Sequence, residues 1–244
     1  MLTGRYPQTH GLMDLVGPCG WALRDFSQHV TSVLRGAGFE NFLFGVQHEA
    51  AGGDAARLAF DEVHPLWRAG GAVACDGVAD EVSRFLLARG RRRRPFYAQV
   101  GFFETHTPLD FGGVQPDDAA GVTVPPYLAD TPAARQAMGL LQGAVRKVDC
   151  AVGAIADALR RSGLEDDTLL VVTTDHGIEV PRAKWHLYDP GIAIAMVLRC
   201  PAAGLVGGRR CDALAGNVDY LPTVLELASV EVPAGVEGRS LAAA

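Results

Sequence analysis

The stretch of sequence that decides the fold is residues 168–177, TLLVVTTDHG. Its first seven residues are apolar or β-branched with no polar alternation, which predicts a short strand covered on both faces. The run ends at Asp175, His176 and Gly177. Ligands in open α/β sheets bind beyond the carboxyl ends of strands, so this strand end is a candidate site. The alternative interpretation is a plain turn, in which Asp175 accepts a backbone hydrogen bond and Gly177 takes a positive φ angle.

Helix-like and strand-like segments alternate on both sides of this stretch. Apolar residues recur every three or four positions over 132–162, where Pro132 suits a first helical turn and Gly163 a C-cap. Similar patterns predict the other elements: helices over 21–37, 77–89 and Tyr220–Leu227, and strands over 42–46, 96–103 and 192–198. This alternation predicts an α/β fold with a mainly parallel central sheet flanked by helices, in a single domain over 1–244.

Composition and charge exclude several classes of protein. With 48% hydrophobic and 20% charged residues the chain can bury a core, which excludes a disordered protein. A net charge of -6 argues against a nucleic-acid partner, and the run Arg91–Arg94 is interpreted as a solvated connection. No apolar stretch reaches the roughly 18 residues of a membrane span, and no signal peptide is visible. Neither a membrane partner nor secretion is therefore predicted.

The cysteines indicate the redox environment of the chain. There are five: Cys19, Cys75, Cys150, Cys200 and Cys211. Their odd number and the lack of zinc-ligand or CxxC spacing predict reduced, buried thiols. Reduced thiols suggest a cytoplasmic location.

Three histidines come directly after predicted strands. His48 lies in the segment 47–49, QHE, and His106 in the segment 104–108, ETHTP, while His176 follows the strand at 168–174. A lone histidine at a strand end is more often structural than functional. Three at corresponding ends of one parallel sheet are expected to converge on one site.

Two further features indicate the chemistry of such a site. Asp175 and His176 supply a carboxylate oxygen and an imidazole nitrogen, which suit a divalent cation if other ligands join them. Of the 22 basic residues only Lys147 and Lys184 are lysine. Because Lys184 follows the same strand end, its compact ammonium is a candidate for binding an anionic oxyacid group. The alternative is a solvated surface lysine.

At this point four segments resemble the sulfatases of the alkaline phosphatase superfamily. The likeness lies, in matching order and spacing, in residues 2–11, 100–108, 148–177 and 184–191. Residues 125–135 are also similar to the heparan N-sulfatase (sulfamidase) branch of that family. The resemblance covers nearly the whole chain. It implies hydrolysis of sulfate esters or N-sulfates in a sulfated small molecule or glycan.

The resemblance also implies roles for individual residues. Asp175 and His176 would be metal ligands, for calcium in the first place and for manganese or zinc as alternatives that accept imidazole. His106 and Lys184 would hold the sulfate oxygens, and His48 would lie beside the nucleophile as a proton-transfer or hydrogen-bonding group. Val46 departs from the family, which commonly has lysine two residues before that histidine.

A larger departure concerns the nucleophile. In this family it is a formylglycine made from Cys or Ser in the pattern Cys/Ser-x-Pro-x-Arg, and neither Cys19 nor Cys200 stands in that pattern. We therefore expect a partial catalytic domain that lacks the nucleophile strand with its metal-binding aspartates and the C-terminal subdomain, and that is inactive alone. Two alternatives stay open: a phosphodiesterase or phosphonate hydrolase of the same superfamily, and a non-catalytic sulfatase remnant.

Overall fold

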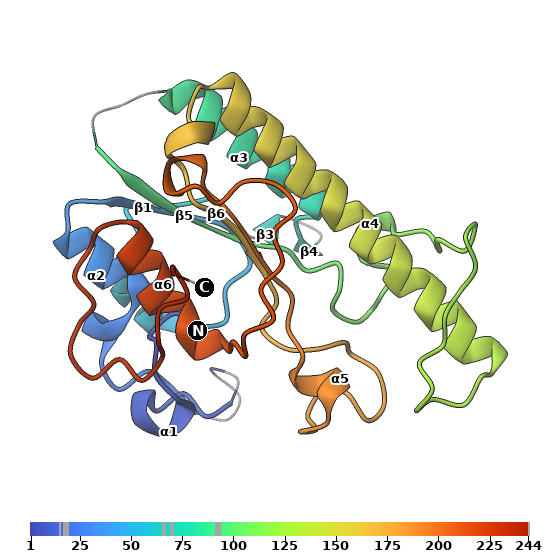
Figure 1. The fold of residues 1–244 in the computed structure, drawn as a ribbon. Helices are drawn as coiled ribbons and strands as arrows, with labels where there is room; N and C mark the ends of the chain where they lie inside the picture. The colour runs from blue at the N-terminus through green and yellow to red at the C-terminus, as the bar shows by residue number, and fades with distance from the viewer. Residues whose placement is uncertain (15, 17–19, 65–66, 69–70, 91–93, 244) are drawn as a thin grey trace.

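The structure is a computed structural model that describes residues 1–14, 16, 20–64, 67–68, 71–90 and 94–243. It confirms the predicted α/β fold (Figure 1). The helices are α1 (Pro7–His10), α2 (Val30–Gly36), α3 (Cys75–Arg89), α4 (Pro132–Arg161), α5 (Asp189–Ile192) and α6 (Tyr220–Leu227). The strands are β1 (Glu40–Gly45), β2 (Glu62–Val63), β3 (Trp67–Arg68), β4 (Gly71–Ala72), β5 (Phe96–Gly101), β6 (Leu170–Thr173) and β7 (Met196–Arg199).

The sheet that carries the first two histidines is parallel, as predicted. Its strand order is β2-β1-β5, and the register pairs Glu40 with Phe96 and Gly45 with Gly101. The two strands therefore end at the same edge. Gly45 has a positive φ of 74°, and a Cβ there would lie 1.9 Å from the carbonyl oxygen of Gly101. Only glycine therefore allows this close approach at the edge where the chain leaves both strands.

The strand β6, within residues 168–177, differs from its prediction in two respects. β6 pairs with β7 in an antiparallel register, from Leu170–Arg199 to Thr173–Met196, in a separate two-stranded sheet. Every residue of β6 is half-buried rather than covered on both faces. The partner strand begins at Met196 instead of Ile192, because residues 189–192 form the short helix α5.

Helices cover the two faces of the parallel sheet. Figure 1 shows α3 and α4 on one side and α2 and α6 on the other. The alternation of β5 explains this, because Phe96, Ala98 and Val100 pack against the α3–α4 core, whereas Tyr97 packs against the α2–α6 core. Fully buried side chains such as Leu221 each stabilise the fold by about 1.5–3 kcal/mol relative to exposure.

The longest helix agrees closely with its prediction. α4 spans Pro132–Arg161, and the Thr131 hydroxyl accepts a hydrogen bond from the Ala134 N–H at 3.1 Å. Gly163 follows the helix with a positive φ of 72°. Both ends thus carry the residue types that satisfy the unpaired backbone groups of a helix terminus.

The predicted helix over 21–37 is wrong in its first half. The regular helix α2 begins only at Val30, after a 3-10 turn over Phe26–Gln28. The Asp25 carboxylate accepts a hydrogen bond from the Ser27 N–H at 2.9 Å, and the ring of His29 faces Thr31 N at 3.4 Å. These side chains satisfy backbone donors locally, so helical geometry does not start earlier.

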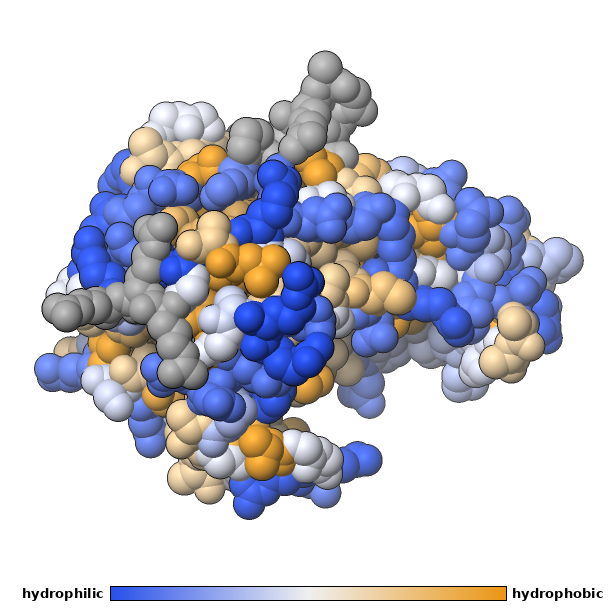
Figure 2. Space-filling view, turned by 90° about the horizontal axis from the view of Figure 1, so that it is seen from above, coloured by the Kyte–Doolittle hydropathy of each residue, from blue (hydrophilic) through white to orange (hydrophobic). Residues whose placement is uncertain are grey.

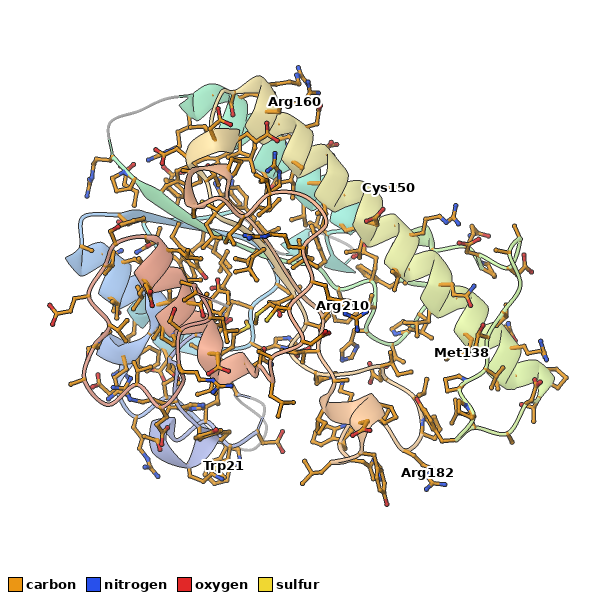
Figure 3. All side chains as sticks on the ribbon, in the orientation of Figure 1. Trp21, Met138, Cys150, Arg160, Arg182 and Arg210 are labelled. Carbon is orange, nitrogen blue, oxygen red and sulfur yellow. The ribbon has the colours of Figure 1, made fainter. Side chains whose placement is uncertain are left out.

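The cysteines correct a second expectation. Cys75 and Cys200 are buried free thiols, but Cys150 and Cys211 are exposed ones. Figure 3 shows Cys150 on α4. Cys19 and most of the arginine run, residues 91–93, lie outside the described residues.

The surface and the helices bear on the question of a membrane partner. On the face shown in Figure 2, hydrophobic residues occur as separate patches among hydrophilic ones. In the described part of the chain, no helix combines the length and the apolar character needed to cross a membrane.

The lysine outside the candidate site has a structural role. Glu104 is 0% exposed, and its carboxylate accepts hydrogen bonds from the Cys75 N–H at the start of α3 and, at 3.2 Å, from the Phe103 N–H. Lys147 on α4 places its Nζ 3.9 Å from Glu104 Oε1 and donates to the Gly112 carbonyl. Lys147 therefore compensates a buried carboxylate and ties α4 to the turn after β5.

Candidate functional site

His106 lies in the turn that follows β5. Its ring stacks on Phe103, with ring centroids 4.8 Å apart, and its Nδ1 lies 2.6 Å from the carbonyl oxygen of Thr107. Because a carbonyl can only accept a hydrogen bond, Nδ1 carries the proton and donates it. The lone pair of Nε2 in the neutral ring then faces Lys184, whose Nζ is 3.2 Å away. The structure thus brings together two residues that are 78 positions apart.

Lys184 is placed by a compact segment after β6. Its N–H donates to the carbonyl of Ile178 at 3.1 Å, and the Gly177 N–H donates to the carbonyl of Gly191 at 2.9 Å. A Cβ at Gly177 would lie 1.8 Å from the Pro190 carbonyl oxygen, and a Cβ at Gly191 would lie 2.2 Å from a backbone oxygen. Gly177 does not have the positive φ that the plain-turn interpretation requires. Glycine is needed here for close backbone approach instead.

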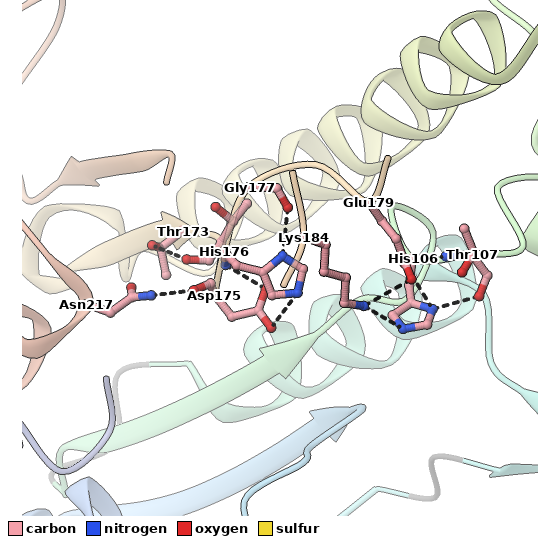
Figure 4. Close-up of polar contacts among 10 residues, drawn as sticks. His106, Thr107, Thr173, Asp175, His176, Gly177, Glu179, Lys184 and Asn217 are labelled. Carbon is pink, nitrogen blue, oxygen red and sulfur yellow. Dashed lines mark hydrogen bonds and ion pairs between the residues drawn. The ribbon is translucent and has the colours of Figure 1, made fainter. Parts of the chain in front are cut away.

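Glu179 joins the two basic groups and was missed from the sequence. Its Oε1 lies 3.1 Å from Lys184 Nζ, and its Oε2 accepts the Thr107 N–H at 2.9 Å and lies 3.6 Å from His106 Nδ1 (Figure 4). The side chains of Glu179 and Lys184 are 21% and 16% exposed, against 42% for His106. The only signal in the sequence was that Glu179 lies between the strand end and Lys184.

The surroundings of Glu179 favour its ionised form. Burial raises the pKa of its carboxyl, but the hydrogen bond from the Thr107 N–H and the bond from Lys184 lower it by more. The net pKa therefore lies below the ordinary value. Glu179 is an anion at neutral pH and forms a charge pair with Lys184.

His106, Glu179 and Lys184 are called the cluster below. Asp175 and His176 form a second group beside the cluster (Figure 4). Asp175 Oδ1 accepts the His176 N–H at 2.9 Å, and His176 Nδ1 lies 2.7 Å from the Gly177 carbonyl oxygen. That carbonyl makes Nδ1 the protonated nitrogen, which leaves the Nε2 lone pair 3.6 Å from Asp175 Oδ2. Asn217, which the sequence reading also missed, holds the turn by donating to the Asp175 carbonyl at 2.6 Å.

The acceptor atoms of this turn are of the kind that a divalent cation binds. Two acceptor atoms 3.6 Å apart, one carboxylate oxygen and one imidazole nitrogen, are suitable in type and spacing for two ligands of one ion. The Asp175 side chain is 80% exposed and therefore accessible. Within the described ranges, however, no group of three or more His, Cys, Asp or Glu side chains could hold a metal. Asp175 and His176 alone do not complete a coordination shell.

His48 lies apart from these contacts. It follows β1 at the same sheet edge as His106, and its side chain is exposed. Among the residues that the structure describes, His48 has no polar contact with His106 or Lys184. The structure therefore pairs His106 with Lys184 and Asp175 with His176, and leaves the predicted role of His48 without a contact.

The residue after His48 forms a buried polar chain. Gln99 on β5 donates to Glu49 Oε1 at 2.7 Å, and the Tyr97 hydroxyl donates to Gln99 Oε1 at 3.2 Å. Glu49 Oε2 is buried with no hydrogen-bond partner within the described residues. Burial raises the pKa of Glu49 to about 6, although the hydrogen bond from Gln99 acts in the opposite direction.

The fold and the cluster together define a class of protein. Strands deliver an ammonium, an imidazole and a carboxylate to one region beyond their carboxyl ends, as in α/β proteins that bind an anionic ligand there. The family model described as Sulfatase matches residues 1–230, and the chain belongs to the sulfatase family. The resemblance seen in the sequence is therefore confirmed.

Individual relatives cover different parts of the chain. N-sulphoglucosamine sulphohydrolase of Homo sapiens is 33% identical over 116 residues, which make up 48% of this chain and 23% of the human protein. A solved protein in complex with its substrate D-glucosamine-2-N,6-O-disulfate aligns with a TM-score of 0.70 at 17% identity, over 99% of this chain and 68% of the other. Phosphonate monoester hydrolase from Silicibacter pomeroyi aligns with a TM-score of 0.67 at 20% identity, over 98% of this chain and 64% of the hydrolase.

Sequence identity and the length covered limit what each relative shows. At 17% and 20% identity, the two solved structures show the shared fold alone. The stretch that matches the human protein spans about a quarter of that protein's length (23%).

Proposed function

We propose that the chain forms a sulfatase-like domain that holds the anionic group of a sulfate ester or N-sulfate. The observation that carries this proposal is the 3.2 Å contact between Lys184 Nζ and His106 Nε2. When Nε2 of His106 also carries a proton, two nitrogens this close can donate to two oxygens of one tetrahedral oxyanion. Membership of the sulfatase family supports sulfur rather than phosphorus at its centre.

Each residue has a separate task in this proposal. Lys184 binds a sulfate oxygen as a compact positive charge and stabilises negative charge that develops when the ester bond breaks. His106 holds a second oxygen once its Nε2 also carries a proton, and its ring is fixed by the Thr107 carbonyl and by stacking on Phe103. His48 stays a predicted proton-transfer group at the same sheet edge.

We propose that Asp175 and His176 supply two ligands of a divalent cation. Calcium is the first candidate, and manganese and zinc are alternatives that accept imidazole. When bound, the cation would supply a positive charge near the oxyanion. Further ligands have to join these two.

The nucleophile is the part of the reaction that these 244 residues do not provide. None of their Cys or Ser residues is followed by the pattern x-Pro-x-Arg. We therefore propose that the chain alone binds a sulfate ester but hydrolyses it slowly or not at all, because positioning and charge stabilisation act without a covalent step.

The substrate class is proposed from the relatives. The human relative is named for a sulfated glucosamine, and one solved structure of the same fold binds a disulfated glucosamine. A sulfated sugar or glycan is therefore the proposed substrate. The same fold in a phosphonate monoester hydrolase keeps phosphonate hydrolysis as the second candidate.

Calorimetric titration with 4-nitrophenyl sulfate tests the proposal, because the same compound reports turnover through released 4-nitrophenolate. We expect Lys184→Ala to weaken binding about tenfold, or ~1.4 kcal/mol, as expected for the loss of one charge-assisted contact. Arg160→Ala is the matched control, since it removes one exposed positive charge at the far end of α4. Its affinity should equal that of the wild type.

Two results would contradict the proposal. Equal affinities of the wild type and the Lys184 variant would show that the cluster does not bind the anion. Turnover by the wild type well above that of a His106→Ala, Lys184→Ala double variant would disprove the absence of a covalent step.

A further inference from the structure

A carboxylate lies inside the cluster that is proposed to bind an anion. Glu179 contacts Lys184 Nζ at 3.1 Å and is held by the Thr107 N–H at 2.9 Å, so its position is fixed from both sides of the cluster. A negative charge at this point opposes anion binding. Its contacts hold Lys184 and the Thr107 N–H in place, and its charge acts on any anion bound beside it.

We propose that Glu179 is a specificity-determining residue that makes the cluster favour singly charged oxyanions over doubly charged ones. This inference rests on the proposed function of Lys184 and His106. A sulfate monoester carries one negative charge, whereas a phosphate monoester carries close to two above neutral pH. Glu179 therefore separates two ligands of nearly the same shape by their charge.

The charges within the cluster produce this selection. Before an anion binds, Nε2 of His106 directs its lone pair at the Lys184 ammonium, so the three side chains together carry one positive and one negative charge. An oxyanion bound to Lys184 would lie about 5 Å from the Glu179 carboxylate, given ordinary hydrogen-bond lengths. The repulsion scales with the ligand's charge, so a dianion experiences about twice the repulsion of a monoanion. Lys184 attracts both, but the doubled repulsion from Glu179 adds to the larger cost of removing a dianion from water, and together they outweigh the stronger attraction of the dianion to Lys184.

Three probes with the same leaving group separate charge from the identity of the central atom. They are 4-nitrophenyl sulfate (one negative charge), 4-nitrophenyl phosphate (two) and 4-nitrophenyl methylphosphonate (one), each titrated calorimetrically at pH 8. In the wild type, we expect the sulfate and the phosphonate to bind within about threefold of each other and the phosphate about tenfold more weakly.

The variants assign the discrimination to one residue. Glu179→Gln should bind the phosphate more tightly and reduce the sulfate-to-phosphate preference about tenfold. Glu179→Asp keeps the charge and should keep the preference. Glu165→Gln is the matched control, because Glu165 also forms a partly buried ion pair, with Arg199 at 2.5 Å, and its preference should equal that of the wild type.

The outcomes distinguish this inference from the proposed function. If the wild type binds none of the probes, or Lys184→Ala binds them equally well, the proposed function fails and the inference fails with it. If binding depends on Lys184 but Glu179→Gln keeps the wild-type preference, the inference alone is overturned. If the glutamine variant does not fold, the wild-type comparison decides, because a phosphonate that binds as weakly as the phosphate would overturn selection by charge.

Discussion

Replacing Glu49 by glutamine should stabilise the protein in a way that depends on pH. Glutamine keeps an oxygen that can accept the hydrogen bond from Gln99, but it removes the ionisable group. The pKa of Glu49 is raised from 4.5 to about 6 by burial, so the folded protein binds this proton more tightly than the unfolded chain does. At pH values between these two pKa values, the folded state binds more protons than the unfolded state does. The free energy of unfolding of the wild type therefore falls as pH rises.

The magnitude follows from the same pKa. At about 1.4 kcal/mol for each tenfold change in the proton equilibrium, a pKa that moves from 4.5 to about 6 corresponds to about 2 kcal/mol. Below pH 4 the carboxyl is protonated in both states and contributes no such difference. Glu49→Gln should therefore gain about 2 kcal/mol over the wild type between pH 4 and pH 7, mostly between pH 4.5 and about 6.

Urea unfolding at a series of pH values from 4 to 7 measures this gain. Contributions from other groups cancel when the two free energies of unfolding are subtracted at each pH. The more exposed Glu165→Gln provides the control, and its difference from wild type should not follow the titration of Glu49. A difference between Glu49→Gln and wild type that is constant over this pH range would refute the argument from burial.

Three further substitutions test buried polar contacts of the fold and the turn that carries Lys184. Glu104→Gln removes the charge that Lys147 compensates and should lower the free energy of unfolding by about 2–4 kcal/mol in urea denaturation. Asn41→Ala removes side-chain hydrogen bonds to the carbonyls of Thr31 and Ala59, at 2.8 and 3.0 Å, and should cost about 2 kcal/mol by the same measurement. Gly177→Ala would place a Cβ 1.8 Å from a backbone oxygen, so it should abolish Lys184-dependent binding of 4-nitrophenyl sulfate; undiminished binding would show that the turn does not position Lys184.

Local sequence patterns determined some elements of the fold and not others. The helix α4 was predictable because its apolar spacing, its Thr131 cap and Gly163 all act within the helix or next to it. The start of α2 was not, because His29 and Asp25 bind backbone donors that the apolar pattern ignores. The direction of β7 was also not predictable, since an apolar run is compatible with either a parallel or an antiparallel partner.

Some residues of the candidate site were predictable from the sequence and others were not. The ends of the predicted strands located His106, which contacts Lys184 in the structure. The convergence of His48 is not seen in the described contacts. Glu179 and Asn217 were missed because their partners lie 72 and 42 positions away in sequence. Contacts of this kind depend on how separate segments pack, which single-segment patterns do not contain.

The ion pair between Lys147 and Glu104 has a mechanical consequence for the cluster. Glu104 lies two residues before His106, and bonds from both α3 and Lys147 fix it, so two long helices clamp the turn that carries the imidazole. The segment that carries Lys184 protrudes around α5 in Figure 1, and its Leu187 is 91% exposed. One half of the cluster is therefore anchored to the core, while the other half depends on a surface segment. A displacement of that segment would move the ammonium and leave the imidazole in place.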